Sequence, residues 1–197
     1  MNGIWETLLY PGECLSLYSK KQDKRIIDGG IVLRWRWKQT GGFDKFLERH
    51  FYDRELEEAF LTCLDIGEQS FSSYPKGIEL FPEDRELVKS RNIFLSGGSL
   101  GLAFLLGMIT FIYGKQWPNR VVAWGGLLPI RNNSFAVYAV DYIDHKIDLA
   151  KKIDASTIIH PESEKHLIIE SIREIRITAP IVSAMCQLES VIKEKDM

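Results

Sequence analysis

Residues 30–38 alternate between apolar and basic side chains, which is the pattern of a half-buried β-strand. One face carries Ile31, Leu33, Trp35 and Trp37, and the other carries Arg34, Arg36 and Lys38. Because successive side chains of a strand point to opposite faces of a sheet, we expect the tryptophans inside and the basic residues outside. A stacking platform for nucleic acid needs exposed aromatic rings beside the basic groups, so no nucleic-acid binding is expected on this strand.

The other segments of the first 90 residues predict further strands and one helix. Strands are predicted at 14–18 and 77–81, with a charged turn at 20–25. A helix is predicted at 53–64, and 82–90 is predicted to be a charged connection.

From residue 91 onward, strand patterns alternate with helical ones. Strands are predicted at 93–95, 121–124, 135–140, 157–159 and 175–177, helices at 100–113, 141–153, 164–174 and 180–195, and glycine turns at 97–98 and 125–126. We therefore expect one α+β (mixed α/β) domain, with a β-rich portion at 1–90 and a βαβ portion at 91–197.

Residues 92–114 carry no charged side chain, and their length alone would admit a membrane-spanning helix. Glycines interrupt the segment, two of them adjacent at Gly97-Gly98. A membrane span needs one continuous helix, so a short strand, a turn and a buried helix are the preferred interpretation. No contact with a membrane is expected.

The composition indicates a single domain without a strongly charged surface. The chain has 197 residues, with 25 basic and 27 acidic side chains and a formal net charge of −2. This balance argues against a nucleic-acid partner, which would be bound largely through phosphate contacts. The length is typical of one domain and leaves no space for an ATPase domain beside a catalytic one.

Cysteine and histidine usage indicates neither disulfides nor a metal site. The three cysteines are far apart and form no CxxC pair, and the four histidines fit no metal-ligand spacing. The N-terminal segment lacks the basic start and the long apolar run of a signal peptide. We therefore expect a cytoplasmic protein without a metal or other cofactor.

The predicted helix at 141–153 places one charged residue on its apolar face. At about 100° per residue, Ile147, Leu149, Ala150 and Ile153 share one arc, and Lys146 falls within it. Burial disfavours the ammonium form of a lysine, so the neutral amine becomes available as a general base. The alternative is a lysine whose stem covers apolar surface while its amine reaches solvent.

A serine begins the predicted buried helix at 100–113. In Ser96-Gly97-Gly98-Ser99-Leu100-Gly101, Ser99 follows two glycines at the point where backbone N–H groups have no partner within the helix. Such N–H groups can hold an oxyanion while a serine hydroxyl attacks a carbonyl. An ordinary helix-capping serine is the alternative.

These two segments resemble the proteolytic domain of Lon proteases, and the resemblance covers about half of the chain. That family opens its nucleophile helix with Pro-Ser-Ala-Gly, and Gly98-Ser99-Leu100-Gly101 stands at the matching place. The family then has a strand, a helix with the general-base lysine, and a short strand ending at proline. Residues 136–140, the helix through Lys146 and residues 157–161 follow in that order here. The resemblance implies that Ser99 is the nucleophile and Lys146 the general base.

Several positions depart from the family pattern. Gly98 and Leu100 replace the proline and the alanine that flank the serine. Trp124 stands where the family has the threonine that supports the lysine, and Asp141-Tyr142 stands where it has two glycines before the lysine helix. The hairpin between them is also longer, around residues 129–134.

The expected function is that of a serine endopeptidase with a Ser99–Lys146 dyad. The backbone N–H groups of Gly98 and Ser99 would hold the oxyanion. Since the chain has no ATPase domain, we expect ATP-independent cleavage of a specific protein partner, or action with a regulatory or ATPase chain. Self-association into a homo-oligomer is left open.

Three alternatives remain at this stage. A catalytically inactive domain of the same fold, acting as an interaction or assembly module, is suggested by Trp124 and Asp141-Tyr142. Residues 96–101 also loosely resemble a phosphate-binding loop of small-molecule kinases with a related fold, which would predict ATP binding. The third alternative is a membrane span at 92–114.

Overall fold

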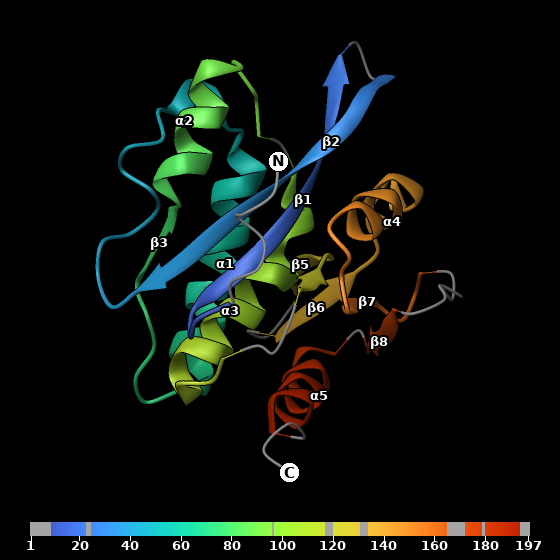
Figure 1. Ribbon diagram of the computed structural model, residues 1–197. Coiled ribbons are helices and arrows are strands. Elements are labelled where there is room, and N and C mark those ends of the chain that lie inside the picture. The colour runs from blue at the N-terminus through green and yellow to red at the C-terminus, as the bar shows by residue number, and fades with distance from the viewer. Residues whose placement is uncertain are drawn as a thin grey trace.

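The two longest strands pair as a hairpin that runs through the middle of the structure (Figure 1). In the computed structural model, β1 (Glu13–Gln22) is antiparallel to β2 (Arg25–Lys38). The structure describes residues 9–22, 25–95, 97–116, 120–130, 134–164, 172–178 and 180–193. Both strands continue into the segment that the sequence pattern assigns to a charged turn. The backbone pairing extends until Gln22 lies opposite Arg25, which makes the turn shorter than predicted.

The predicted alternation along β2 is confirmed. Trp35 and Trp37 are fully buried, whereas Arg36 and Lys38 are exposed and form ion pairs with Glu79 of β3 (Gly77–Leu80) at 2.6 and 3.1 Å. The buried indole N–H groups are satisfied inside the core, and that of Trp37 donates to the Phe104 carbonyl at 2.7 Å. The tryptophans are therefore not available for base stacking beside the basic groups.

A six-stranded mixed sheet organises the single α+β domain. Its strand order is β3-β2-β1-β4-β7-β8, where β4 is Val121–Ala123, β7 is Thr157–Pro161 and β8 is Arg173–Ile177. The first three strands are antiparallel, and β1, β4, β7 and β8 are parallel. A separate two-stranded sheet is formed by β5 (Gly126–Ile130) and β6 (Ser134–Tyr138).

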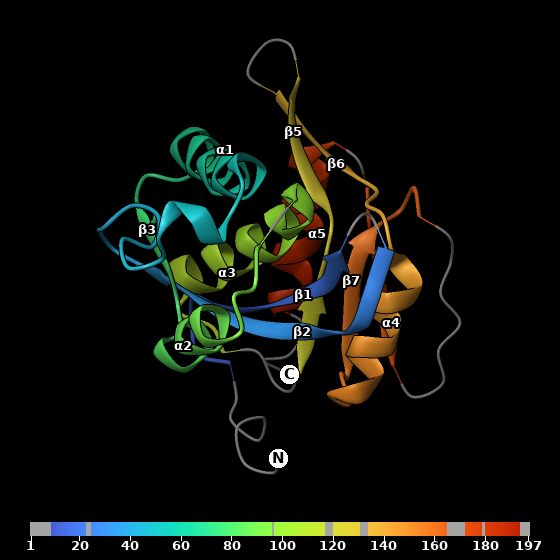
Figure 2. The ribbon, with the colours of Figure 1, turned by 90° about the horizontal axis from the view of Figure 1, so that it is seen from above.

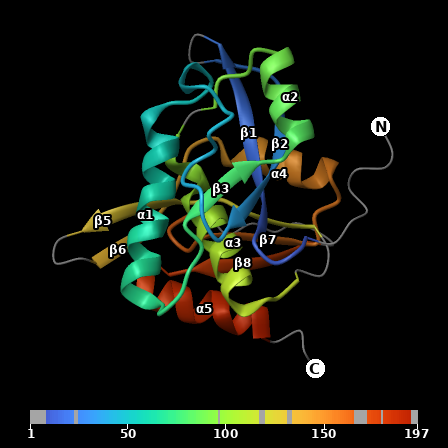
Figure 3. The same cartoon turned by 90° about the vertical axis from the view of Figure 1, so that its left-hand side faces the viewer.

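Helices pack against the central hairpin at two places. The helix α3 (Gly101–Tyr113) packs on β1 and β2 and is covered by α1 (Arg54–Ser70). The helix α4 (Ile143–Lys152) contacts the same two strands toward their hairpin end (Figures 1 and 2). The last helix, α5 (Ile181–Lys193), crosses below the ends of α1 and α3 (Figure 3).

Several predicted elements differ from the structure. Residues 82–90 form the helix α2 (Pro82–Ser90), because proline at its start, two acidic residues in its first turn and Lys89 in its last turn favour a helix. Of the predicted strand 93–95, only Leu95 forms a bridge, with Tyr52. The predicted helix 164–174 is wrong at its end, because β8 begins at Arg173; residues 165–171 lie outside the described residues.

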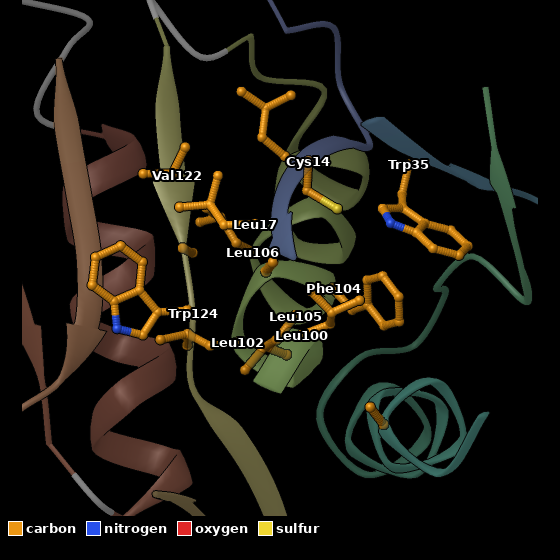
Figure 4. Close-up of a cluster of buried hydrophobic side chains, with 14 of the residues drawn as sticks. Cys14, Leu17, Trp35, Leu100, Leu102, Phe104, Leu105, Leu106, Val122 and Trp124 are labelled. Carbon is orange, nitrogen blue, oxygen red and sulfur yellow. The ribbon is translucent and has the colours of Figure 1, made fainter. Parts of the chain in front are cut away.

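The uncharged segment folds as predicted into a turn and a buried helix. A short 3-10 turn, Gly98–Leu100, leads into α3, whose residues 101–110 are all buried. A helix that is apolar all round is stable only when every face is covered. Here α3 contributes to the cluster between β1, β4 and α1, with Phe104 against Trp35 and Leu102 near Trp124 (Figure 4). Within the described part of the chain, no helix is long and apolar enough to cross a membrane.

The packing of α3 predicts how the fold responds to a cavity. Phe104 is fully buried, and its ring packs edge-on against Trp35 with centroids 5.3 Å apart. We expect Phe104→Ala to lower the free energy of unfolding by about 3–5 kcal/mol, measured by urea denaturation. Phe94→Ala is the matched control, because Phe94 is 56 % exposed and should change the stability little. Equal losses in the two variants would contradict the role given to α3.

Candidate functional site

Ser99 lies at the entrance of α3, in the turn that the sequence pattern identified. The residue is half-buried within the 3-10 turn Gly98–Leu100, which continues directly into α3 at Gly101. Gly97 precedes the turn with φ 95°, a conformation that favours glycine. Ser96, which belongs to the same motif, lies outside the described residues.

Asp53 ties this turn to the start of α1. One carboxylate oxygen of Asp53 accepts from the Leu56 N–H at 3.0 Å and caps α1, and the other accepts from the Gly97 N–H at 3.0 Å. The Asp53 N–H also donates to the Leu95 carbonyl at 3.0 Å. One side chain therefore fixes the chain immediately before Ser99.

Gly125 holds the other side of the turn through two backbone hydrogen bonds. Its N–H donates to the Ser99 carbonyl at 2.9 Å, and its carbonyl accepts from the Leu102 N–H at 2.9 Å. Gly125 has φ 151°, and a Cβ atom there would lie 2.9 Å from Pro161 Cγ. A larger residue would disturb this contact, so the glycine is needed for the backbone of Ser99 to be held from this side.

Lys146 is buried where the helical periodicity predicted it. The residue is 4 % exposed, and its Nζ lies 3.4 Å from Ser99 Oγ. Nζ also donates to the Leu17 carbonyl of β1 at 3.1 Å. The two predicted catalytic side chains are thus adjacent, although they are 47 residues apart in the sequence. Their separation is at the long end of hydrogen-bonding distances, which is common in a nucleophile–base pair without substrate.

The departures from the Lon pattern do not separate these two side chains. Tyr142, at the position of a family glycine, caps α4 with φ 64° and ψ 38°, the left-handed conformation that glycine adopts most easily. Trp124, at the position of the supporting threonine, is fully buried, and its Nε1–H donates to Glu164 at 2.9 Å. The Leu17 carbonyl of β1 is a hydrogen-bond partner of Lys146 instead.

The first turn of the helix supplies donors beside Ser99. The N–H groups of Gly98 and Ser99 come at the start of a 3-10 turn, where no helical carbonyl precedes them as an acceptor. The Tyr138 hydroxyl lies close by, 3.1 Å from where a Cβ of Gly98 would be. Burial and the charge of Glu55 raise the pKa of the Tyr138 phenol, so it stays protonated and able to donate. The sequence pattern did not indicate Tyr138, because β5 and β6 bring it to this place.

A buried ionic cluster lies behind the site, on β7 and β8. His160 is fully buried, with Nε2 2.7 Å from Glu174 Oε1 and Nδ1 3.3 Å from Glu164 Oε2. Trp124 stacks on the imidazole at 5.8 Å between centroids. Burial alone would lower the pKa of His160, but the two glutamates beside the imidazole outweigh it and raise the pKa above 6.5.

No relative identifies this site. Comparison with protein-family models gives no match for the chain, and comparison with curated proteins gives none either. Among the residues that the structure describes, no group of three or more histidine, cysteine, aspartate or glutamate side chains is placed to hold a metal ion. The groups that the described residues place together here are the Ser99 hydroxyl and the Lys146 amine, beside the backbone of the turn that begins α3.

The raised pKa of His160 predicts how stability depends on pH. Protonated His160 stabilises the folded state, and this contribution is complete below pH 6.5 and is lost as the pH rises through the raised pKa. Urea denaturation between about pH 6 and about pH 9 should show the free energy of unfolding falling with pH. The slope should be smaller in His160→Gln and unchanged in His145→Gln, whose histidine is exposed. Identical slopes in the wild type and His160→Gln would show that the cluster does not hold a proton.

Proposed function

We propose that the protein is a serine endopeptidase that uses Ser99 as the nucleophile and Lys146 as the general base. The observation that carries the proposal is the 3.4 Å distance between Ser99 Oγ and Lys146 Nζ, with the lysine 4 % exposed. A nucleophile, a base within reach of it and a third group that orients the base are the parts that this chemistry requires. The Leu17 carbonyl is the orienting group, 3.1 Å from Nζ.

The first half of the reaction forms an acyl-enzyme. Neutral Lys146 donates one N–H to Leu17, and its lone pair accepts the Ser99 hydroxyl proton. Ser99 Oγ then bonds to the peptide carbonyl carbon, and the resulting oxyanion is held by the N–H groups of Gly98 and Ser99. When the C–N bond breaks, the Lys146 ammonium returns its proton to the leaving amine.

The second half releases the acyl group. Lys146 takes a proton from a water molecule, whose oxygen attacks the ester carbonyl. The tetrahedral intermediate uses the same oxyanion donors and collapses with return of the proton to Ser99 Oγ. Neither half requires a cofactor or ATP.

The substrate class follows from this chemistry and from the order of the elements. Ser99 at a helix start, a hairpin, the Lys146 helix and a strand ending at Pro161 follow one another as in Lon proteolytic domains, which supports a protein substrate. A cytoplasmic peptidase of this kind would cleave an exposed segment of one partner protein, or receive unfolded chain from a regulatory or ATPase partner. Assembly into a homo-oligomer would be compatible with either mode.

The proposal predicts loss of cleavage in two variants and not in a third. A mixture of peptides from denatured proteins is incubated with the purified protein, and products are identified by mass spectrometry. Ser99→Ala and Lys146→Ala should each lose at least about a hundredfold in rate. Lys151→Ala is the matched control, because Lys151 lies on the exposed face of the same helix.

Two outcomes would contradict the peptidase. Cleavage that persists in both dyad variants would come from a contaminant or from another site. Absence of cleavage and of Ser99 modification by a fluorophosphonate in the wild type would favour a non-catalytic interaction module of this fold. The observation behind that second function is the length of the contact between Ser99 Oγ and Lys146 Nζ, 3.4 Å.

A further inference from the structure

We propose that Glu164 is a positioning residue that holds the Ser99 turn and the Lys146 helix at a fixed position relative to each other. The positioning role rests on the proposed function, whereas the hydrogen bonds described below do not depend on it. The Glu164 side chain is fully buried and uses both carboxylate oxygens. Oε2 accepts from Trp124 Nε1–H at 2.9 Å, and Oε1 accepts from the Val140 N–H at 3.0 Å. Trp124 directly precedes Gly125, which holds the Ser99 turn, and Val140 lies just before the helix that carries Lys146. We call this pair of hydrogen bonds the Glu164 bridge.

The Trp124 side of this bridge leads to Ser99. The Trp124 N–H donates to the Ile159 carbonyl at 3.1 Å, so its backbone is anchored to β7. The next residue, Gly125, makes the two 2.9 Å hydrogen bonds to Ser99 and Leu102. A shift of the indole would therefore be transmitted to the backbone that holds the nucleophile.

The Val140 side leads to Lys146. Val140 lies two residues before Tyr142, which caps α4 in the left-handed conformation. The Tyr142 carbonyl accepts from the Lys146 N–H at 3.2 Å, so this carbonyl and the lysine belong to the same first turn. By accepting a hydrogen bond from the Val140 N–H, Glu164 thus fixes where α4 begins and where the Lys146 amine lies.

The surroundings of Glu164 keep its carboxylate in place. His160 Nδ1 lies 3.3 Å from Oε2, in ionic contact and without hydrogen-bond geometry, and His160 Nε2 is held by Glu174 at 2.7 Å. Arg176 donates to the backbone carbonyls of Glu162 and Glu164 at 2.5 and 3.3 Å, which fixes the turn itself. A buried carboxylate with two N–H donors and an imidazole beside it has little freedom to move.

The substitution Glu164→Gln tests the bridge with almost no change in volume. A glutamine has one acceptor oxygen, and its NH2 group cannot accept from Trp124 or Val140, so one of the two hydrogen bonds is lost. We expect the rate of Ser99 phosphonylation by a fluorophosphonate to fall roughly tenfold to a hundredfold. Glu162→Gln is the matched control, since Glu162 is exposed on the same turn.

Amide hydrogen exchange reports the same bridge without using activity. The amides of Leu102 and Lys146 donate to Gly125 and Tyr142, so they sense the two ends of the bridge. In Glu164→Gln, one or both should exchange roughly tenfold faster, while the Trp37 amide, which donates to Gly12 in the core, stays unchanged. Trp124→Phe removes the indole N–H donor together with part of the ring volume, on the Ser99 side of the bridge, and should accelerate Leu102 but not Lys146.

The outcomes of these two experiments test the Glu164 bridge separately from the proposed peptidase activity. Faster exchange at these amides together with slower Ser99 labelling supports the proposal. Faster exchange in a protein whose wild type never labels at Ser99 keeps the bridge and rejects the proposed function. Unchanged exchange at both amides, acceleration that includes Trp37, or an unaltered labelling rate in an active protein would each overturn the positioning role.

Discussion

The structure depends on one constraint, which is that a buried lysine amine must be satisfied by groups from distant parts of the chain. Lys146 enters the interior between α4 and the central hairpin, where an unpaired ammonium would be very costly. The Leu17 carbonyl accepts one N–H, and the Ser99 hydroxyl is the polar group next to it. The same arrangement that satisfies the amine places it beside a hydroxyl, which is the geometry that the proposed general base requires.

The turn that carries Ser99 is held by contacts from α1 and from the segment after β4. Asp53 joins the turn to the cap of α1, and the backbone of Gly125 brackets Ser99 and Leu102. Because α3 is apolar on all faces and buried along its first ten residues, its start cannot shift without disturbing the core. The proposed dyad needs a fixed relation between the Ser99 turn and the Lys146 helix, and Glu164 contacts both supporting segments.

The residues that periodicity and helix-end rules can identify were predicted, and those that depend on long-range pairing were not. Lys146 was found because one charged residue fell on an apolar helical face, and Ser99 because it follows two glycines at the start of an uncharged helix. The strand β5, with its tyrosine-bearing partner β6, was not assigned, and α2 was missed although its proline and terminal charges favour a helix. The Leu17 carbonyl and the Glu164 bridge leave no local pattern, because they join residues 129 and 40 positions apart.

The most direct measurement of the central claim is a crystal structure of the protein with a peptide boronate, whose tetrahedral adduct resembles the reaction intermediate. The account predicts a covalent bond between boron and Ser99 Oγ. One boronate oxygen should lie within hydrogen-bonding distance of the Gly98 and Ser99 N–H groups, with Lys146 Nζ beside Oγ. A boronate bound elsewhere, or no adduct while Ser99 and Lys146 remain adjacent, would contradict the assignment of this pair as a catalytic dyad.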